Sequence, residues 1–191
     1  MWRFRYERKS DMKQLFSLAL ITLALAACST QQKRPMNQMA GYCADYQWDM
    51  RNELAIADGA MVATPAFVSA EGAALPVSLN RKLALSLYPT SDVRFVVELE
   101  KRGKKVDEFA GLAKVRVDQA GTYRFSTVIP YWVEIVSSDG KRIKSNKFEM
   151  QSQCKKVFKS AAFPLQANTD YWLQMSASRD QNTAIIITKE P

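Results

Sequence analysis

The chain of 191 residues contains no histidine. This absence excludes Ser-His-Asp and Cys-His catalysis and metal sites built on imidazole, because each of them needs a histidine side chain. The sequence also lacks a glycine-rich phosphate loop, a cysteine pair with zinc-ligand spacing and a nucleophile elbow. Chemistry that uses carboxylates alone, or a serine with a lysine, is not excluded.

Long apolar runs are scarce, and the one that matters lies near the start of the chain. It extends from Leu15 to Ala27 behind Lys13. A membrane-spanning helix, the alternative interpretation, needs about 20 apolar residues, which is more than this run supplies. A short apolar run behind a positive start is typical of a secretory signal. We therefore predict a signal peptide at residues 1–27, in which residues 1–11 are a mis-called start or a long n-region.

The signal ends in Leu25-Ala26-Ala27, and Cys28 follows directly. These four residues resemble the lipobox of bacterial lipoproteins. The resemblance implies that Cys28 is lipidated and becomes the first mature residue, on a membrane outside the cytoplasm. In that family an Asp at the next position retains the protein in the inner membrane, so Ser29 implies the periplasmic side of the outer membrane. Residues 28–40 are mostly polar with little to bury, and we expect a lipidated flexible tether.

The net charge falls once the leader is removed. The whole chain carries +8, and the first 27 residues account for five basic and two acidic side chains, which leaves +5. This is less basic than a dedicated nucleic-acid binder. We expect no nucleic-acid partner, no metal and no cofactor.

Two cysteines remain if Cys28 carries lipid, and they are Cys43 and Cys154. Disulfides persist in an oxidising compartment, and a single pair allows a single intramolecular connectivity. We predict a bond that closes a loop of about 110 residues, worth about 4 to 5 kcal/mol in chain-entropy models. Two separate buried thiols are the alternative.

Apolar residues at the start of the mature domain recur at intervals of three and four, which is the period of a helix. The set consists of Cys43, Tyr46, Met50, Leu54, Ala57 and Met61. With Gly59 as a stop signal, we predict an N-terminal helix at 43–58. Asp45, Asp49 and Glu53 recur every four residues in it and could hold a cation, but a solvated face is the expected interpretation.

From Val77 onward, alternating hydrophobicity and regular turn signals favour β-strands, whereas residues 61–76 are expected to be a connection. Asp139-Gly140 is the strongest hairpin signal. The predicted strands are 77–88, 93–99, 109–117, 122–129, 132–136, 142–149, 156–165, 170–178 and 183–189. We predict that residues 41–191 form one mainly β domain. The expected fold is an antiparallel β-sandwich of eight or nine strands, jelly-roll or Ig-like, with one N-terminal α-helix.

Several short motifs support the β-sandwich class. They are Gly121-Thr122-Tyr123-Arg124-Phe125, Asp170-Tyr171-Trp172-Leu173-Gln174-Met175-Ser176, the Asp-Gly hairpin, and Cys154 followed by Phe163-Pro164-Leu165. Their order resembles the bacterial pre-peptidase C-terminal type of domain and a group of uncharacterised Gram-negative periplasmic proteins. The resemblance implies a small extracytoplasmic β-sandwich, and it implies no catalytic residue.

Three basic clusters lie in the β region, the first two on predicted turns. They are Lys101, Arg102, Lys104 and Lys105, then Lys141, Arg142, Lys144 and Lys147, then Lys155, Lys156 and Lys159. If these turns converge, they form a surface for an anionic envelope component, such as lipopolysaccharide phosphate or peptidoglycan carboxylate, or for an acidic protein. The alternative is that they keep the protein soluble and block edge pairing.

Two Tyr-Trp pairs are candidates for binding as well. Neighbouring residues on a strand point to opposite faces, so one ring of each pair is expected in the core and the other outside. An exposed Trp132 or Trp172 could stack on a sugar or enter a partner's pocket, and partly covered packing is the alternative. The predicted partner-binding residues are therefore Lys101, Arg102, Lys104, Lys105, Lys141, Arg142, Trp132 and Trp172.

Taken together, these features predict a non-enzymatic lipoprotein anchored in the outer membrane. It is expected to act in the periplasm as an accessory or binding module for an envelope component or a partner protein. An inhibitor or immunity protein of a periplasmic hydrolase is one alternative. A hydrolase that uses carboxylates or a Ser-Lys pair is another.

Overall fold

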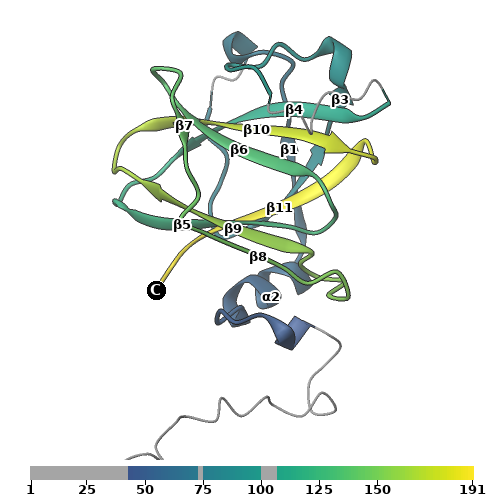
Figure 1. Ribbon diagram of the computed structural model, residues 1–191, viewed down its shortest axis with the longest axis vertical. Coiled ribbons are helices and arrows are strands. Elements are labelled where there is room, and N and C mark those ends of the chain that lie inside the picture. The colour runs from purple at the N-terminus through teal and green to yellow at the C-terminus, as the bar shows by residue number, and fades with distance from the viewer. Residues whose placement is uncertain (1–42, 73–74, 100–106) are drawn as a thin grey trace, which may run out of the picture. The chain divides into compact units, whose positions relative to one another are not determined.

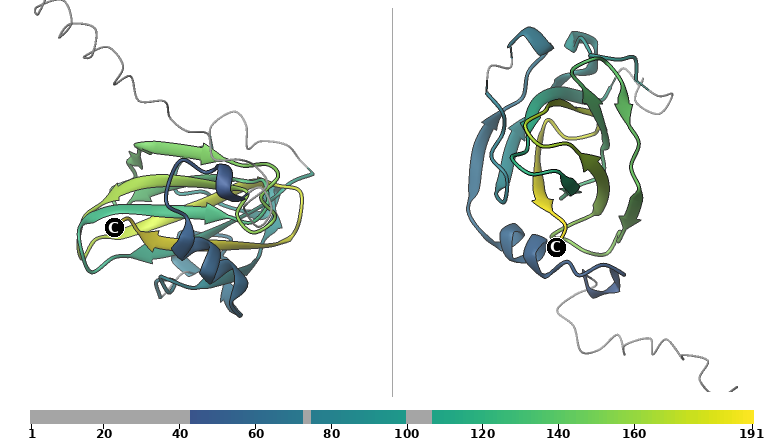
Figure 2. Two further views of the ribbon diagram at one scale, coloured as in Figure 1. Left: turned by 90° about the horizontal axis from the view of Figure 1, so that it is seen from below. Right: turned by 90° about the vertical axis from the view of Figure 1, so that its left-hand side faces the viewer.

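Two β-sheets packed face to face make up the domain (Figures 1 and 2). The computed structural model describes residues 43–72, 75–99 and 107–191. The larger sheet has the order β1 (Met61–Pro65), β2 (Lys82–Ser86), β11 (Asn182–Lys189), β5 (Gly121–Thr127), β9 (Lys159–Leu165), β8 (Lys147–Met150). The smaller sheet has the order β3 (Tyr88–Pro89), β4 (Phe109–Arg116), β10 (Asp170–Ser178), β6 (Trp132–Ser137), β7 (Arg142–Ile143).

The predicted fold class is confirmed. Every strand pair in the two sheets is antiparallel except β1 with β2, which run parallel. The described residues contain eleven strands, more than the eight or nine expected, because several of the added strands are short. In these residues, no helix is long and apolar enough to cross a membrane.

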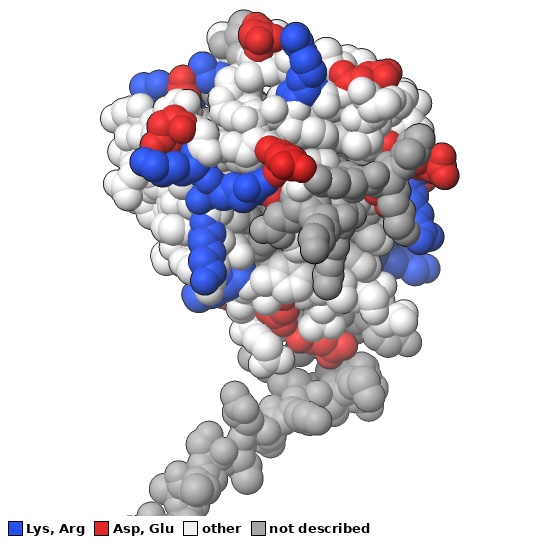
Figure 3. All heavy atoms as spheres, turned by 45° about the horizontal axis from the view of Figure 1, so that its top comes forward, with Lys and Arg blue, Asp and Glu red and all other residues white. Residues whose placement is uncertain are grey.

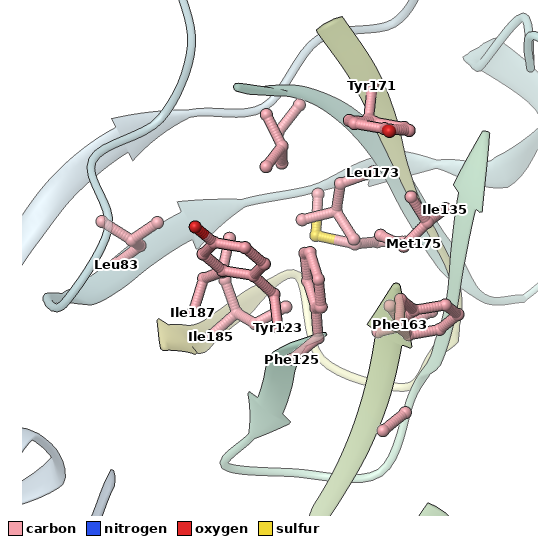
Figure 4. Close-up of a cluster of buried hydrophobic side chains, with 14 of the residues drawn as sticks. Leu83, Tyr123, Phe125, Ile135, Phe163, Tyr171, Leu173, Met175, Ile185 and Ile187 are labelled. Carbon is pink, nitrogen blue, oxygen red and sulfur yellow. The ribbon is translucent and has the colours of Figure 1, made fainter. Parts of the chain in front are cut away.

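The main core fills the space between the sheets (Figure 4). Alternate residues of β5, β10 and β11 point into it, as the period-two pattern predicts. Phe125 meets Phe163 of the neighbouring strand edge-to-face, with ring centroids 5.4 Å apart. The side chains labelled in Figure 4 are Leu83, Tyr123, Phe125, Ile135, Phe163, Tyr171, Leu173, Met175, Ile185 and Ile187.

The outer face of the larger sheet is covered by residues 43–58, which we call the N-terminal cap. The cap contains a 3-10 turn, η1 (Cys43–Asp45), and one α-helix, α2 (Arg51–Asp58). Its apolar side chains form a second cluster that includes Ile186 of β11. The run Ala184-Ile185-Ile186-Ile187 is therefore buried on both of its faces, which explains its continuous hydrophobicity.

The predicted disulfide is confirmed, whereas the predicted helix at 43–58 is too long. Cys43 and Cys154 are bonded, with their Cα atoms 4.5 Å apart. Residues 46–50 are not helical. Long-range bonds hold this part of the cap, because Tyr46 donates its hydroxyl proton to Val157 O (3.0 Å) and Gln47 N–H donates to Glu149 Oε1 (2.6 Å).

The predicted strand at 93–99 is wrong. This segment lies across the outer face of the smaller sheet, where Val93 packs on Ala110 and Leu112. The buried side-chain amide of Gln174 accepts from Val97 N–H (3.1 Å) and donates to Val97 O (3.3 Å). A side chain of the sheet thus satisfies the backbone groups that a neighbouring strand would otherwise satisfy.

Three further segments differ from expectation. Residues 61–76, predicted as a connection, contain β1. Residues 77–88 and 142–149, each predicted as one strand, are each divided between the two sheets, as β2 with β3 and β7 with β8. The Asp139-Gly140 hairpin is confirmed, since β7 pairs with β6 and Gly140 has the positive φ of 81° that the turn requires.

Candidate functional site

The basic residues predicted to bind a partner divide into two groups. The first group lies outside the described residues and consists of Lys101, Arg102, Lys104 and Lys105. The predicted lipidation site, Cys28, also lies outside them. Lys141 and Arg142 lie on the β6–β7 hairpin, and each has a carboxylate beside it. Lys141 Nζ lies 2.7 Å from Asp139 Oδ2, and Arg142 Nε lies 3.2 Å from Glu134 Oε1.

These pairings change what the hairpin offers to a ligand. Hydrogen bonds from Lys141 and then Ser137 lower the pKa of Asp139 to about 2, so its carboxylate stays charged beside the lysine. Lys156, from the third predicted cluster, pairs in the same way with Asp58 (2.6 Å). Figure 3 shows basic and acidic side chains interspersed on one face of the molecule. The described basic side chains therefore form a mixed surface in this region, with limited attraction for an anion.

The Tyr-Trp pairs have the predicted alternation. Tyr131 and Tyr171 are buried in the core, while Trp132 and Trp172 are half-buried on the opposite face of the smaller sheet. Trp172 lies between Lys114 and Val136 of the neighbouring strands. It is therefore a partly covered packing residue.

Charged groups beside Trp172 are also paired. Asp170 accepts from Lys114 (2.8 Å) and from Arg116 (3.0 Å), and these hydrogen bonds lower its pKa. Trp172 thus lies next to a three-residue ion cluster with a net charge of one positive unit. The structure brings this tryptophan together with Lys114 and Arg116, not with Lys141.

Trp132 lies beneath a buried lysine. Lys159 Nζ is 5.3 Å from the centre of the Trp132 ring, and only 7% of the lysine is exposed. Burial lowers the pKa of Lys159 to about 8. Sequence reasoning placed Lys159 in a basic cluster with Lys155 and Lys156 and gave no indication that it is buried. The missed signal was the alternation with Phe163, which puts Lys159 on the inward face of β9.

Three polar groups, on Trp132 and on the strand neighbours of Lys159 and Trp132, lack partners. Thr127 lies directly opposite Lys159 on β5, and Ser176 lies opposite Trp132 on β10. Thr127 Oγ1, Ser176 Oγ and Trp132 Nε1 are buried and have no hydrogen-bond partner within the described ranges. We call Lys159, Trp132, Thr127 and Ser176 the Lys159 cluster. Buried polar groups are nearly always paired, so this concentration of unpaired ones is unusual.

A second buried charge lies under the N-terminal cap. Arg124 Nη1 is 3.5 Å from Glu53 Oε1 and donates to Asp49 O (2.7 Å), while its Nε lies 3.2 Å from Glu190 Oε1. Trp48 covers the guanidinium at 5.2 Å. This arginine therefore joins the cap to the outer face of the larger sheet.

The expected solvated row of carboxylates is wrong at Glu53, which is 2% exposed and also accepts from Thr188. Asp45 and Asp49 are exposed, as expected. Within the described ranges, no group of three or more His, Cys, Asp or Glu residues is placed to hold a metal ion. Glu53 was expected to be exposed to solvent, but it contacts Arg124 and Thr188 and so holds the cap against the larger sheet.

An open groove lies against β1, β2 and β11, with a volume of about 710 Å³. Its lining includes the small side chains Ala63, Ala84 and Ala184 together with Met61 and Tyr88. Among the described residues that line it, Lys82 is the one with a charge, and Lys82 Nζ donates to Ala57 O of the cap (2.8 Å). The groove therefore suits an apolar, uncharged surface, and its described lining contains no carboxylate for acid–base chemistry.

No family model matches the chain, and no curated protein matches it.

Proposed function

We propose that this protein is a non-enzymatic, lipid-anchored binding module. It would be tethered through Cys28 to the periplasmic side of the outer membrane and would hold a partner protein in the groove. The observation that carries this proposal is the groove itself, which is open, apolar and free of unpaired charge. Such a lining favours an uncharged segment of a protein over an anionic lipid or glycan.

The edge of the larger sheet supports a protein partner. β1 is the last strand in the sheet order, and its residues Met61 and Val62 are exposed. A terminal strand presents backbone N–H and C=O groups to which an extended segment can add. The same strand contributes Met61 and Ala63 to the groove, so one extended segment would contact both the edge and the groove.

The alternatives receive less support. A Ser-Lys hydrolase requires a serine in hydrogen-bond contact with the lysine, and Lys159 makes no such bond to a described serine. An inhibitor or immunity protein would be a particular case of a protein partner. It is therefore one possible outcome of the experiment that tests the groove.

Site-specific photocrosslinking in intact cells tests the proposal. A photoreactive residue at Ala63, in the groove, is expected to form an adduct with one protein, and mass spectrometry then identifies that protein. The matched control places the same residue at Ser138, which is exposed on the β6–β7 hairpin and is not in the groove. Adducts that are equal at both positions, or adducts with glycan or lipid alone, would contradict a protein partner in the groove.

A further inference from the structure

Lys159 carries a buried positive charge that has no negative partner among the residues that the structure describes. Its ammonium lies over the ring of Trp132, 5.3 Å from the ring centre. Its neighbours across the sheet are Thr127 on β5 and Met150 on β8, neither of which is charged. A buried charge without a counter-ion is destabilising, so such a group is a candidate for a functional site.

The polar groups on Trp132 and on the strand neighbours of Lys159 and Trp132 can donate hydrogen bonds. Trp132 Nε1–H can only donate, and the hydroxyls of Thr127 and Ser176 are able to donate. All three are buried and unpaired in the described structure. A positive charge together with unpaired donors favours an acceptor with negative charge, and a carboxylate supplies two oxygens for such contacts.

Large apolar side chains lie on the same side of the neighbouring strand. Phe148 and Met150 alternate on β8, where they are 56% and 50% exposed. Met150 lies directly opposite Lys159. An unbranched methionine is flexible, so the Met150 side chain can adapt to an apolar group bound beside Lys159.

We infer that the Lys159 cluster is a binding site for a small apolar carboxylate. The carboxylate lies against Lys159 Nζ and the Trp132 Nε1–H, and its apolar group lies on Phe148 and Met150. This site shares no residue with the lining of the groove, so it stands independently of the proposed partner protein.

The lowered pKa of Lys159 gives this site a particular pH dependence. The groups that face the lysine from β5, β6 and β8 are Thr127, Trp132 and Met150, and none of them carries a charge. The amine loses its proton near pH 8 in the free protein. Between about pH 6, where the ligand carboxyl is ionised, and that pH, carboxylate affinity is therefore constant, and it decreases above that pH.

Calorimetric titration of the full chain with 4-phenylbutyrate tests the site, and the neutral 4-phenylbutyramide serves as the matched probe. We expect one saturable site for the acid and at least about tenfold weaker binding of the amide. Lys159→Met should reduce the affinity for the acid to the affinity for the amide. Trp132→Phe, which keeps the ring and removes its N–H, should cause a smaller loss.

Lys155→Met is the control, because Lys155 is an exposed lysine close to the site in sequence. It should leave the affinity unchanged. Equal binding of acid and amide, full binding by a folded Lys159→Met variant, or no saturable binding of the acid would each overturn the inference. So would an affinity that stays constant to about pH 10, because that profile belongs to an exposed lysine.

Discussion

Lys159 shows how a single residue can oppose the stability of the fold around it. Its pKa is about 8 in the folded protein, whereas 10.5 is its ordinary value. Below pH 8 both the folded and the unfolded chain carry the charge, and the folded state bears the full penalty of burying it. Between these two pKa values the unfolded chain binds more protons, so the free energy of unfolding increases with pH.

Replacing this charge should stabilise the protein. We predict that Lys159→Met raises the free energy of unfolding at pH 7 by about 1 to 3 kcal/mol, because a shift of one pKa unit corresponds to about 1.4 kcal/mol. Urea denaturation of both proteins measures the difference. The advantage of the variant should shrink as pH rises from 8 to 10, and an advantage that is independent of pH would contradict the argument. The buried Tyr46 and Tyr131 are present in both proteins, so their effect cancels.

At the scale of elements, the N-terminal cap depends on contacts that are distant in sequence. Only eight of its residues form the helix α2, and an isolated helix of that length is not stable in water. The disulfide and the Glu53–Arg124 pair hold it against the larger sheet. The cap is therefore the element most sensitive to the loss of a single covalent bond.

Removing both cysteines tests this dependence. We predict that the double variant Cys43→Ser, Cys154→Ser loses about 2 to 5 kcal/mol of stability, because the long loop is no longer closed. Hydrogen exchange should accelerate more in α2 than in β10, which is central in the smaller sheet. An equal acceleration in both elements would mean that the cap and the sandwich unfold as one unit.

Elements with local signals were predictable from the sequence. Period-two alternation identified β5. The Asp139-Gly140 pair identified the β6–β7 hairpin, because the turn requires a positive φ that glycine adopts easily. The segment 93–99 was not predictable, because it has the composition of a strand and its bonds go to the side chain of Gln174, far along the chain. Its place depends on tertiary contacts that no local pattern encodes.

The residues of the candidate sites also differ in whether a local sequence pattern indicates them. The placement of Trp132 on the face opposite Tyr131 was predicted, because neighbouring residues on a strand point to opposite faces. The buried state of Glu53 and Lys159 was missed, because Arg124 and Trp132 approach them from distant segments. The groove was missed because β1, β2 and β11 form it jointly and no short motif marks it.

At the scale of the whole molecule, we propose that one chain combines a lipid anchor with a binding domain. Cys28 and the tether would set the location, and the sandwich would present the groove and the Lys159 cluster. These functions are carried by different parts of the chain. Loss of the lipid should therefore change the location of the protein without changing the fold of residues 43–191.

Metabolic labelling tests the anchor. We predict that labelled palmitate enters the protein and that Cys28→Ala abolishes the incorporation. The variant should leave the membrane fraction and keep its disulfide, measured by mass mapping without reduction. Label retained by Cys28→Ala, or absent from the parent protein, would contradict the lipoprotein assignment.

The disulfide also determines how the domain bears mechanical load. A pull on the chain before Cys43 reaches the sandwich through the Cys43–Cys154 bond, which leads into the segment before β9. The helix α2 follows Cys43 in the chain and is therefore shielded from that pull. Cys154 lies between β8, the edge strand of the larger sheet, and β9, which is flanked by β5 and β8, so force is divided between the edge and the interior of that sheet. A module held between a membrane and a partner would keep its cap under tension.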